Sequence, residues 1–288
     1  IYDTMVRLSR GNETLLHPYV DGKGNFGKSY LRDTAYAASR YTEVKLMPIC
    51  EELFRDIDKD AIDMVDNYDG TRKEPSLLPT SFPSILVNFN VGIAVGMASN
   101  ICPFNLKEIC EATIALIKNP ETDIGDIVKA PDFPVGGLIL YDAASMHQII
   151  DTGRGSIKVR SKYRYDEKEH CIEVTEIPPT TTVEAIVEKV IELAKTGKIK
   201  EVSDIRDETD LGGLKIAIDI KKCTDPDKLM TKLFKLTPLE DAFACNFNVL
   251  IGASPRVMGV KEIITEWTAF RTECVKRRTY FELSKNNV

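Results

Sequence analysis

Residues 36–46 are Tyr36-Ala37-Ala38-Ser39-Arg40-Tyr41-Thr42-Glu43-Val44-Lys45-Leu46, and the interpretation of the whole chain starts from them. Tyr41 follows Arg40 directly, and Arg32 and Lys45 are close to it in sequence. A tyrosine hydroxyl is a poor nucleophile at neutral pH because its reference pKa is about 10. Neighbouring cations favour the phenolate and stabilise charge that builds on a phosphate under attack. The stretch is therefore compatible with phosphoryl transfer through a phosphotyrosine, or with a tyrosine that only packs at the surface.

The residues after Tyr41 predict a helix. Residues 42–43 are typical of a helix start, and the apolar residues that follow extend the pattern towards Ile57. Proline is tolerated only in the first turn of a helix, so we expect the regular part to begin near Met47 or Pro48. Tyr41 would then lie just before a helix N-terminus, where free N–H groups and the helix dipole favour a bound phosphate.

A glycine-rich string, GKGNFG at residues 22–27, matches the G-x-G-x-x-G fingerprint of dinucleotide binding. That fingerprint needs a buried parallel strand before it and a helix that opens on it. Residues 17–18, His-Pro, interrupt the preceding run, and no regular alternation of strands and helices follows. We therefore expect a turn, either one whose N–H groups approach a phosphate or one that is purely structural.

Length and composition are those of a globular protein with room for two domains. The chain has 288 residues, of which 43% are hydrophobic and 28% are charged. The longest apolar stretch, residues 85–98, is interrupted by Asn88, Asn90 and two glycines, so we expect no membrane span. The first residue is Ile1 and not Met, and we interpret the chain as an excised or processed fragment.

Cysteine usage indicates a reducing compartment. The seven cysteines are spread singly, without a Cys-x-x-Cys pair, and the three histidines do not cluster with them. This spacing speaks against a zinc site and against a disulfide framework. We therefore expect a cytoplasmic location.

The formal net charge of −6 is unevenly distributed. Residues 1–45 carry seven basic and five acidic side chains, a net charge of +2. Residues 46–75 carry nine acidic and four basic side chains, a net charge of −5. The sign changes just after Tyr41, which favours a basic surface near the tyrosine despite the acidic total.

Helical and strand-like patterns alternate irregularly along the chain. Apolar residues at helical spacing predict helices over 1–10, 106–117, 183–194, 227–236 and 260–283. Alternating residues predict strands over 156–164, 171–177, 214–220 and 246–251. This mixture predicts an α+β fold.

Seven strings of the sequence form an ordered set. They are VDGKGNFG (20–27), RYTE (40–43), VDNYDGT (65–71), GIAVGMA (92–98), PDFP (131–134), TGRG (152–155) and RDETD (206–210). In this order and spacing they resemble the A subunit of the bacterial type IIA topoisomerases, the family of DNA gyrase and topoisomerase IV. The resemblance covers nearly the whole chain and does not separate the two members. Ser39 and Pro48 depart from the family's usual pattern.

The resemblance implies three domains. Residues 1–150 would form a winged-helix-type DNA cleavage domain whose N-terminal part is missing. Residues 151–259 would form an α/β tower domain, and residues 260–288 the truncated start of a coiled-coil arm. Residues 1–10 would be the end of a recognition helix, the helix that enters the DNA groove in a helix-turn-helix.

The resemblance also implies a mechanism. Tyr41 would attack a backbone phosphate and form a 5′-phosphotyrosine link, giving transient double-strand cleavage that allows strand passage. Arg40 would stabilise the phosphate under attack. Ile93 has two interpretations: core packing, which is usual for isoleucine, or the family's apolar wedge that bends DNA between base pairs, which we favour. The other implied contacts are Arg7, Arg32 and Lys45 for DNA and Asp3 for inhibitors.

The family works as an assembly of two A and two B subunits on double-stranded DNA, with a homodimer of A subunits at its centre. The resemblance places both Mg²⁺ and ATP on the B subunit. This sequence has no compact carboxylate cluster, so we expect no metal site on it.

Three alternatives stay open. The isolated fragment could be a non-catalytic DNA-binding and bending module. A nucleotide-binding enzyme could use the glycine-rich string. A tyrosine recombinase would need a dispersed set of arginines and histidines, and His17, His147 and His170 show no such pattern.

Overall fold

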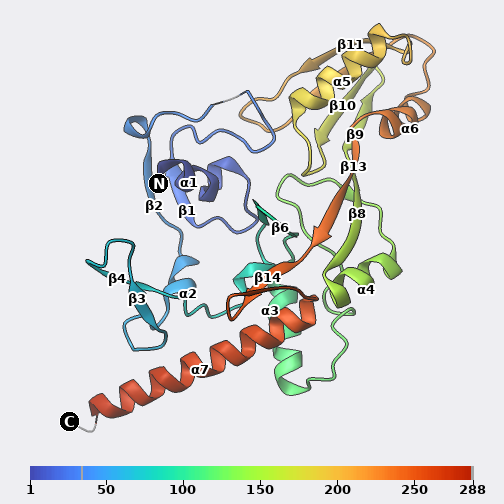
Figure 1. Cartoon of the computed structure of the whole chain (residues 1–288). Helices are drawn as coiled ribbons and strands as arrows, with labels where there is room; N and C mark the ends of the chain where they lie inside the picture. Colours follow the sequence, from blue (N-terminus) through green and yellow to red (C-terminus); the bar gives the residue numbers. More distant parts are fainter. Residues whose placement is uncertain (34, 287–288) are drawn as a thin grey trace. The chain divides into compact units, whose positions relative to one another are not determined.

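A computed structural model describes residues 1–33 and 35–286 of the chain (Figure 1). These residues form two compact units. Unit 1 comprises residues 1–44, 132–146 and 155–245, and unit 2 comprises residues 45–131, 147–154 and 246–288. Both units combine helices with antiparallel strands, which confirms the predicted α+β class.

Neither unit is one continuous stretch of chain. The units therefore differ from the domains predicted from the sequence, 1–150, 151–259 and 260–288, which stay predictions. Residue 34 and the last two residues of the third predicted domain lie outside the described residues.

Unit 1 contains α1, α5, α6 and most of the strands. Its elements, some of which continue across the unit boundary, are α1 (Tyr2–Leu8), η1 (Arg10–Asn12), β1 (Val20–Lys23), η2 (Ser39–Tyr41), β2 (Glu43–Leu46), β7 (Leu138–Ile139), β8 (Arg154–Arg160), β9 (Lys162–Asp166), β10 (Cys171–Glu176), α5 (Val183–Lys195), β11 (Val202–Asp207), β12 (Ile216–Ile220), α6 (Pro226–Leu236) and β13 (Glu240–Asn246).

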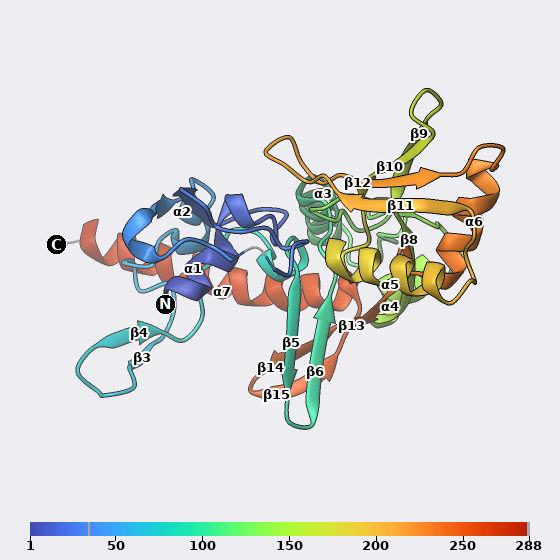
Figure 2. The same ribbon diagram turned by 90° about the horizontal axis from the view of Figure 1, so that it is seen from above.

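The centre of unit 1 is an antiparallel sheet with the strand order β11-β12-β10-β9. Alternate residues of β10 and β12, among them Ile172, Val174, Ile216 and Ile218, are fully buried. They pack in one cluster with the apolar faces of α5 and α6, and both helices lie on the same side of the sheet (Figure 2). Every second residue of these strands thus faces the helices, which is the alternation that predicted the strands.

Helices α5 and α6 begin and end within a residue of the predicted bounds, whereas α1 ends at Leu8, two residues before the predicted end. The Thr182 hydroxyl accepts a hydrogen bond from the Ala185 N–H at the start of α5. Gly197, with a φ of +72°, follows its end. In α6, the Asp225 carboxylate caps the first turn and Pro226 takes the first helical position. Both caps satisfy N–H groups that a helix cannot pair internally.

The sheet face away from α5 and α6 carries charged side chains in place of apolar ones. Glu173 on β10 is only 8% exposed. Its carboxylate pairs with Arg164 of β9, its cross-strand neighbour, and with the Lys215 ammonium at 3.0 Å. These two cations, Lys215 first, hold the pKa of Glu173 below its usual value. The folded state therefore favours the ionised form of Glu173.

Glu173→Gln is expected to lower the free energy of unfolding by about 1–2 kcal/mol at pH 7, because a hydrogen-bonded charge is lost beside two cations. The lowered pKa means that this stabilisation is present at neutral pH and disappears as the pH falls through the folded-state pKa. Urea denaturation of both proteins at pH 7 and near pH 4 tests this. The exposed Glu167→Gln serves as control, and an equal difference at both pH values would contradict the prediction.

Unit 2 contains three two-stranded hairpins and the long helix α7. Its elements are α2 (Cys50–Phe54), β3 (Met64–Asp66), β4 (Lys73–Pro75), η3 (Ser84–Leu86), β5 (Asn90–Ala94), β6 (Met97–Ile101), α3 (Leu106–Lys118), α4 (Ala143–Thr152, begun in unit 1), β14 (Asn248–Ile251), β15 (Ser254–Val257) and α7 (Val260–Asn286).

The long helix α7 (Figure 1) is tied to the loop that follows α2. The Arg277 guanidinium donates to the Asp60 carboxylate at 3.0 Å, the Asp63 carboxylate at 2.6 Å and the Ile62 carbonyl at 3.0 Å. Trp267 Nε1 donates to Thr80 Oγ1 at 3.0 Å. These polar contacts flank a small cluster in which Cys274 packs against buried residues of the loop. Among the described residues, no helix has the length and apolar character to cross a membrane.

Candidate functional site

Tyr41 lies in a short turn of unit 1, residues 39–42, which we call the tyrosine turn. Residues 39–41 form the single 3₁₀ turn η2, closed by hydrogen bonds from the Tyr41 N–H to the Ala38 carbonyl and from the Thr42 N–H to the Ser39 carbonyl. The Tyr41 side chain is 69% exposed. Its hydroxyl is therefore accessible to a large substrate without opening of the fold.

The prediction of a helix directly after Tyr41 is wrong, whereas the regular part expected near Met47 or Pro48 corresponds to a short helix that begins at Cys50. Thr42 is extended, with φ −127° and ψ 150°, and residues 43–46 form strand β2, which pairs with β1. The first helix after the turn is α2, which is five residues long and begins at Cys50. Strand pairing wins because Thr42 and Val44 are β-branched and Pro48 forbids a helix interior. Strand β2, and not a helix N-terminus, follows Tyr41 directly, so the N–H groups of α2 do not start at the tyrosine turn.

Helix α1 holds the tyrosine turn from one side. The Tyr2 hydroxyl donates to the Ala37 carbonyl at 2.8 Å and lies 2.9 Å from Thr42 Oγ1. One side chain of α1 thus bonds the backbone before Tyr41 and the side chain after it. Because these contacts span Tyr41, they fix the path of the turn relative to α1.

The glycine-rich string also contacts the tyrosine turn. The Asn25 carbonyl accepts a hydrogen bond from the Ala37 N–H at 2.9 Å. Gly24 has a φ of +119°, and a Cβ on it would lie 2.9 Å from Thr42 Cγ2 and 3.1 Å from the Tyr41 carbonyl oxygen. Only glycine permits this approach. Among the described residues, no helix opens on the string, so its geometry is that of a structural turn.

The predicted site residues did not include Tyr2, Asn25 or Gly24. A tyrosine at the start of a helix carries no sequence signal for a partner so far along the chain. The glycines did predict a turn that brings backbone close to something, and the structure identifies that partner as the tyrosine turn itself.

The basic residues near Tyr41 in sequence have different environments. The Arg40 guanidinium carbon lies 4.9 Å from the centre of the Tyr41 ring. The Arg32 guanidinium is engaged by Glu188 at 2.7 Å and by Asp33 at 3.0 Å, and the Arg32 backbone N–H donates to the Glu184 carboxylate at 2.9 Å. Arg7 is exposed on α1. Arg40 is the cation in direct contact with the candidate nucleophile.

Asp3, at the start of α1, accepts a hydrogen bond of 2.6 Å from the Tyr36 hydroxyl. The pKa of Tyr36 is raised by this bond, because the carboxylate stabilises the protonated phenol. Tyr36 also packs edge-to-face on Tyr2, with ring centres 5.8 Å apart. The predicted inhibitor contact is thus part of the packing between α1 and the segment before Tyr41.

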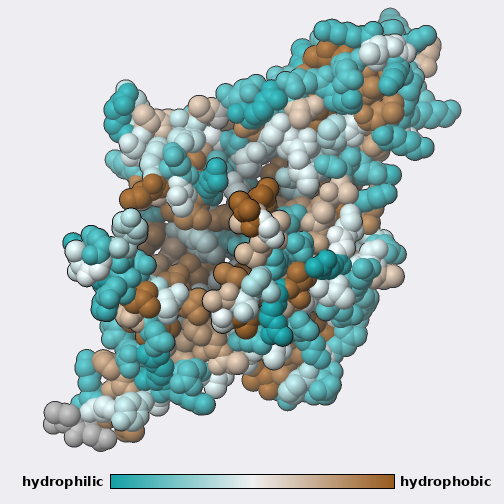
Figure 3. Space-filling view, in the orientation of Figure 1, coloured by the Kyte–Doolittle hydropathy of each residue, from teal (hydrophilic) through white to brown (hydrophobic). Residues whose placement is uncertain are grey.

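Ile93 lies in unit 2, on the antiparallel hairpin of β5 and β6, which we call the Ile93 hairpin. It is 91% exposed, so the core-packing interpretation is wrong. Val91, two residues before it on β5, shares its face at 63% exposure, and Val95 in the turn that follows is 106% exposed. Hydrophobic surface accordingly lies over this hairpin in Figure 3. Lys45, also in unit 2, is exposed.

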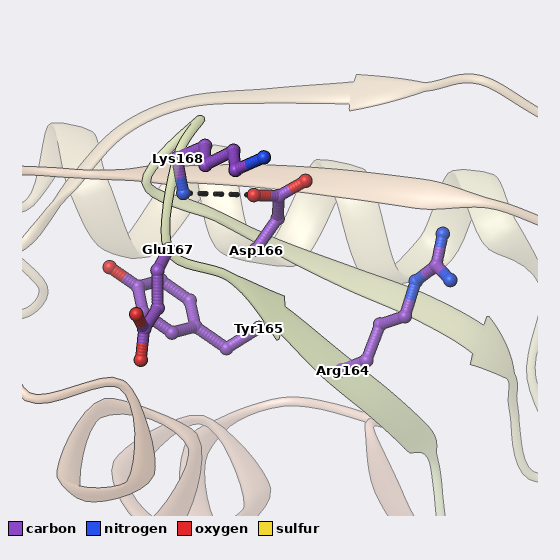
Figure 4. Close-up of a pocket in the computed structure, with 5 residues that line it drawn as sticks. All are labelled: Arg164, Tyr165, Asp166, Glu167 and Lys168. Carbon is purple, nitrogen blue, oxygen red and sulfur yellow. Dashed lines mark hydrogen bonds between the residues drawn. The ribbon is translucent and has the colours of Figure 1, made fainter.

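A shallow pocket elsewhere in unit 1 is formed by five consecutive residues, 164–168, at the turn between β9 and β10 (Figure 4). The Lys168 N–H donates to the Asp166 carboxylate at 2.9 Å, so this carboxylate already closes the turn. Within the described chain, no three His, Cys, Asp or Glu side chains are placed to hold a metal ion. All seven cysteines are free thiols. The tyrosine turn and the Ile93 hairpin therefore remain the candidate sites.

Comparison with known proteins gives one consistent result. A family model that describes the A subunit of DNA gyrase and topoisomerase IV matches residues 1–288. The chain is 40% identical over 292 residues to the DNA gyrase A subunit of Staphylococcus epidermidis, covering 99% of this chain and 32% of the relative. It is 42% identical over 291 residues to that of Ureaplasma parvum serovar 3, covering 99% of this chain and 34% of the relative. The chain thus spans about a third of these curated relatives.

Proposed function

Because the chain belongs to the family of DNA gyrase and topoisomerase IV A subunits, we propose that it is the DNA breakage–reunion part of a type IIA topoisomerase. The main observation in support of this proposal is the geometry of the tyrosine turn. Its tyrosine is exposed, while the turn is held by α1 and by the glycine-rich string. A nucleophile that is accessible and fixed in place needs little reorganisation to reach an attack geometry.

In the proposed reaction, the Tyr41 hydroxyl oxygen loses its proton and attacks a phosphorus atom of the DNA backbone. A new bond forms between this oxygen and phosphorus, and the bond from phosphorus to the 3′ oxygen breaks. The Tyr41 proton passes to solvent water and the departing 3′ oxygen takes up a proton from water, so the cut strand ends in a free 3′ hydroxyl and in a 5′ phosphate joined to Tyr41. The Arg40 guanidinium, which lies beside the ring, stabilises the charge on the phosphate oxygens. Resealing reverses the steps, and the phosphotyrosine ester retains the bond energy it needs.

Two copies of the chain would cut the two strands of one duplex, which requires a homodimer of A subunits. The B subunit of an assembly with two A and two B subunits would supply Mg²⁺ and ATP. Mg²⁺ stabilises the attacking and leaving oxygens. Among the described residues, no three His, Cys, Asp or Glu side chains are placed to hold a metal ion. We place this assembly in the cytoplasm.

We further propose that α1 is the end of a winged-helix recognition helix, with the sheet of β9–β12 and the helices α5 and α6 as the tower domain. The helix α7 would begin the coiled-coil arm. Its last turns are still joined to Lys59 through Glu282 at 2.8 Å, while Tyr280 and Leu283 in these turns are 74% and 57% exposed. Apolar residues at that position on a long helix fit a partner helix. Arg7, Arg32 and Lys45 are proposed DNA contacts. Arg32 must first exchange Glu188 for a phosphate.

The direct test is to trap the covalent intermediate. The complete A subunit, its B subunit, Mg²⁺ and a labelled duplex are mixed and quenched with detergent, and the labelled peptide is identified by mass spectrometry. We expect a 5′-phosphotyrosine on Tyr41. An adduct on any of the nine other tyrosines among the ten in the chain would overturn the assignment. A complex that binds and bends DNA without any adduct would favour the non-catalytic alternative.

Ile93→Ala is expected to reduce DNA bending without a loss of stability. The side chain is 91% exposed, so its truncation costs the fold about 0.5 kcal/mol or less. The lost apolar contact with an opened base step lowers the bent population about tenfold. Energy transfer between dyes on the two ends of a bound duplex measures the bend.

The matched control for Ile93→Ala is Ile101→Ala on the partner strand β6. Ile101 is only 1% exposed, and its truncation is expected to cost about 2 kcal/mol or more of stability. An Ile93→Ala protein that is strongly destabilised, or that bends DNA normally, would contradict the wedge assignment.

A further inference from the structure

One short sequence pattern occurs twice in unit 2, each time at the entry to a β-hairpin. Residues 88–93 are Asn-Phe-Asn-Val-Gly-Ile and residues 246–251 are Asn-Phe-Asn-Val-Leu-Ile. The first copy leads into the Ile93 hairpin and the second into the hairpin of β14 and β15. Figure 2 shows the two hairpins side by side. The second copy therefore lies where it can support the first.

The two hairpins are joined opposite Ile93. Ala98 is the cross-strand partner of Ile93. The Ala98 carbonyl accepts hydrogen bonds from the Asn246 side-chain amide at 2.8 Å and from the Asn248 side-chain amide at 3.3 Å. The pairing of β6 with β13 is limited to Asn100 and Asn246. Where the backbone pairing of β6 with β13 ends, two asparagine side chains thus continue the hydrogen bonding to β6.

Phe247, between the two asparagines, fixes them to the interior of unit 2. It is fully buried and packs edge-to-face on Phe104, with ring centres 6.2 Å apart. Its N–H donates to the Gly153 carbonyl at 2.9 Å, and its carbonyl accepts from the Met258 N–H at 3.1 Å. A Cβ on Gly153 would lie 2.8 Å from Phe247 Cβ. The asparagine side chains therefore start from backbone that is held on both sides.

The outer part of the Ile93 hairpin has little other support. Residues 91–98 are all exposed, and a Cβ on Gly92 or Gly96 would meet nothing within 4 Å. An isolated two-stranded hairpin is marginally stable in water. No charged residue occurs from Pro75 to Leu106, in a chain that is 28% charged. The hairpin thus has an apolar tip that can contact the DNA duplex. The hydrogen bonds to the Ala98 carbonyl, opposite Ile93, keep this tip in place.

We infer that Asn246 and Asn248 are positioning residues for the Ile93 hairpin, which hold Ile93 at the angle needed to open a base step. This inference rests on the proposed function. A wedge can bend a stiff duplex only if the wedge itself resists displacement. The two amides supply that resistance without adding charge beside the DNA. They act through Ala98 and need no contact with the duplex.

The experiment compares DNA bending by the complete A subunit, in complex with its B subunit, before and after Asn246→Ala and Asn248→Ala. Energy transfer across a dye-labelled duplex at saturating protein gives the bent fraction. We expect this fraction to fall at least threefold in the double variant, with DNA affinity within twofold of the unaltered protein. Asn248→Ala alone leaves Asn246 and its backbone pairing intact, and should show a smaller loss in the same direction if the double variant folds poorly.

The control is Asn119→Ala, which removes a different asparagine of unit 2 that is exposed and whose side chain accepts a hydrogen bond from the nearby Glu121 N–H. Adding the Asn246 and Asn248 changes to Ile93→Ala should produce little further loss of bending, because all three act in one step. Fully additive losses, or equal bending by the unaltered protein and the asparagine variants, would overturn this inference alone. A duplex that stays straight with the unaltered protein would overturn the proposed function and this inference with it.

Discussion

Tyr41→Phe is expected to abolish DNA cleavage, with a loss of at least about 10³-fold, because the variant lacks the only atom that can form the phosphotyrosine bond. The ring remains, so the contact with the Arg40 guanidinium at 4.9 Å is retained. The Tyr41 hydroxyl is not among the groups that hold the turn, since those bonds come from its backbone and from Tyr2. DNA affinity should therefore change by about 0.5 kcal/mol or less.

The measurement pairs a cleavage assay with a binding titration on the same preparation of the complete protein. Tyr68→Phe is the matched control, because Tyr68 is fully exposed in the turn between β3 and β4 and loses the same single atom. It should cleave normally. Residual cleavage by Tyr41→Phe at more than a trace would mean that another group is the nucleophile. A parallel loss of binding would mean that the hydroxyl supports the DNA and not the chemistry.

The parts of the fold that the sequence predicts well are those with their determinants close together in the chain. Helix α5 lies between a capping threonine and a left-handed glycine, and both ends match the prediction. Strands β10 and β12 show their alternation directly, because one face packs under the helices and the other carries paired charges. Local patterns suffice where tertiary packing agrees with local preference.

Strand β2 shows where local patterns fail. Residues 42–43 satisfy the rules for a helix start. Residues 43–46 nevertheless form a strand, because they pair with β1. Residues 24–42 lie between the two strands, so their pairing is not visible in any short window of sequence. Non-local hydrogen bonding overrides a weak helix signal. The same distance hides the role of Tyr2, whose partners are residues 37 and 42.

The sequence predicts the contact between Arg40 and Tyr41, but it does not predict the residues that hold the tyrosine turn in place. Tyr41 and Arg40 are adjacent, and their contact follows from their adjacency. Arg32 was grouped with them by sequence distance, but its guanidinium is bound to Glu188 of α5, a residue far along the chain. Charge counts over a window of sequence cannot distinguish a free cation from a paired one. Of these two arginines, Arg40 is the one whose guanidinium contacts the Tyr41 ring.

The second large effect on DNA cleavage is expected at Gly24, a residue without a reactive side chain that contacts the tyrosine turn. Gly24→Ala should lower the cleavage rate roughly 10- to 100-fold, since displacement of a catalytic group by about 1 Å can cost that much. The added Cβ would lie 2.9 Å from Thr42 Cγ2 and 3.1 Å from the Tyr41 carbonyl, at a φ of +119°. To relieve the contact, the tyrosine turn must move away from the glycine-rich string.

The loss from Gly24→Ala must be separated from the general cost of alanine at a positive φ. Gly70→Ala provides this control, because Gly70 has a φ of +67° and a Cβ there would meet nothing within 4 Å. Its backbone strain, about 1–2 kcal/mol, should lower the melting temperature and leave cleavage unchanged. Gly24→Ala should lower cleavage in protein that remains folded by circular dichroism at the assay temperature. Equal cleavage by both variants would show that contact with the glycine-rich string does not position Tyr41. A rate deficit confined to Gly24→Ala would show that the string acts on catalysis through the backbone of the turn.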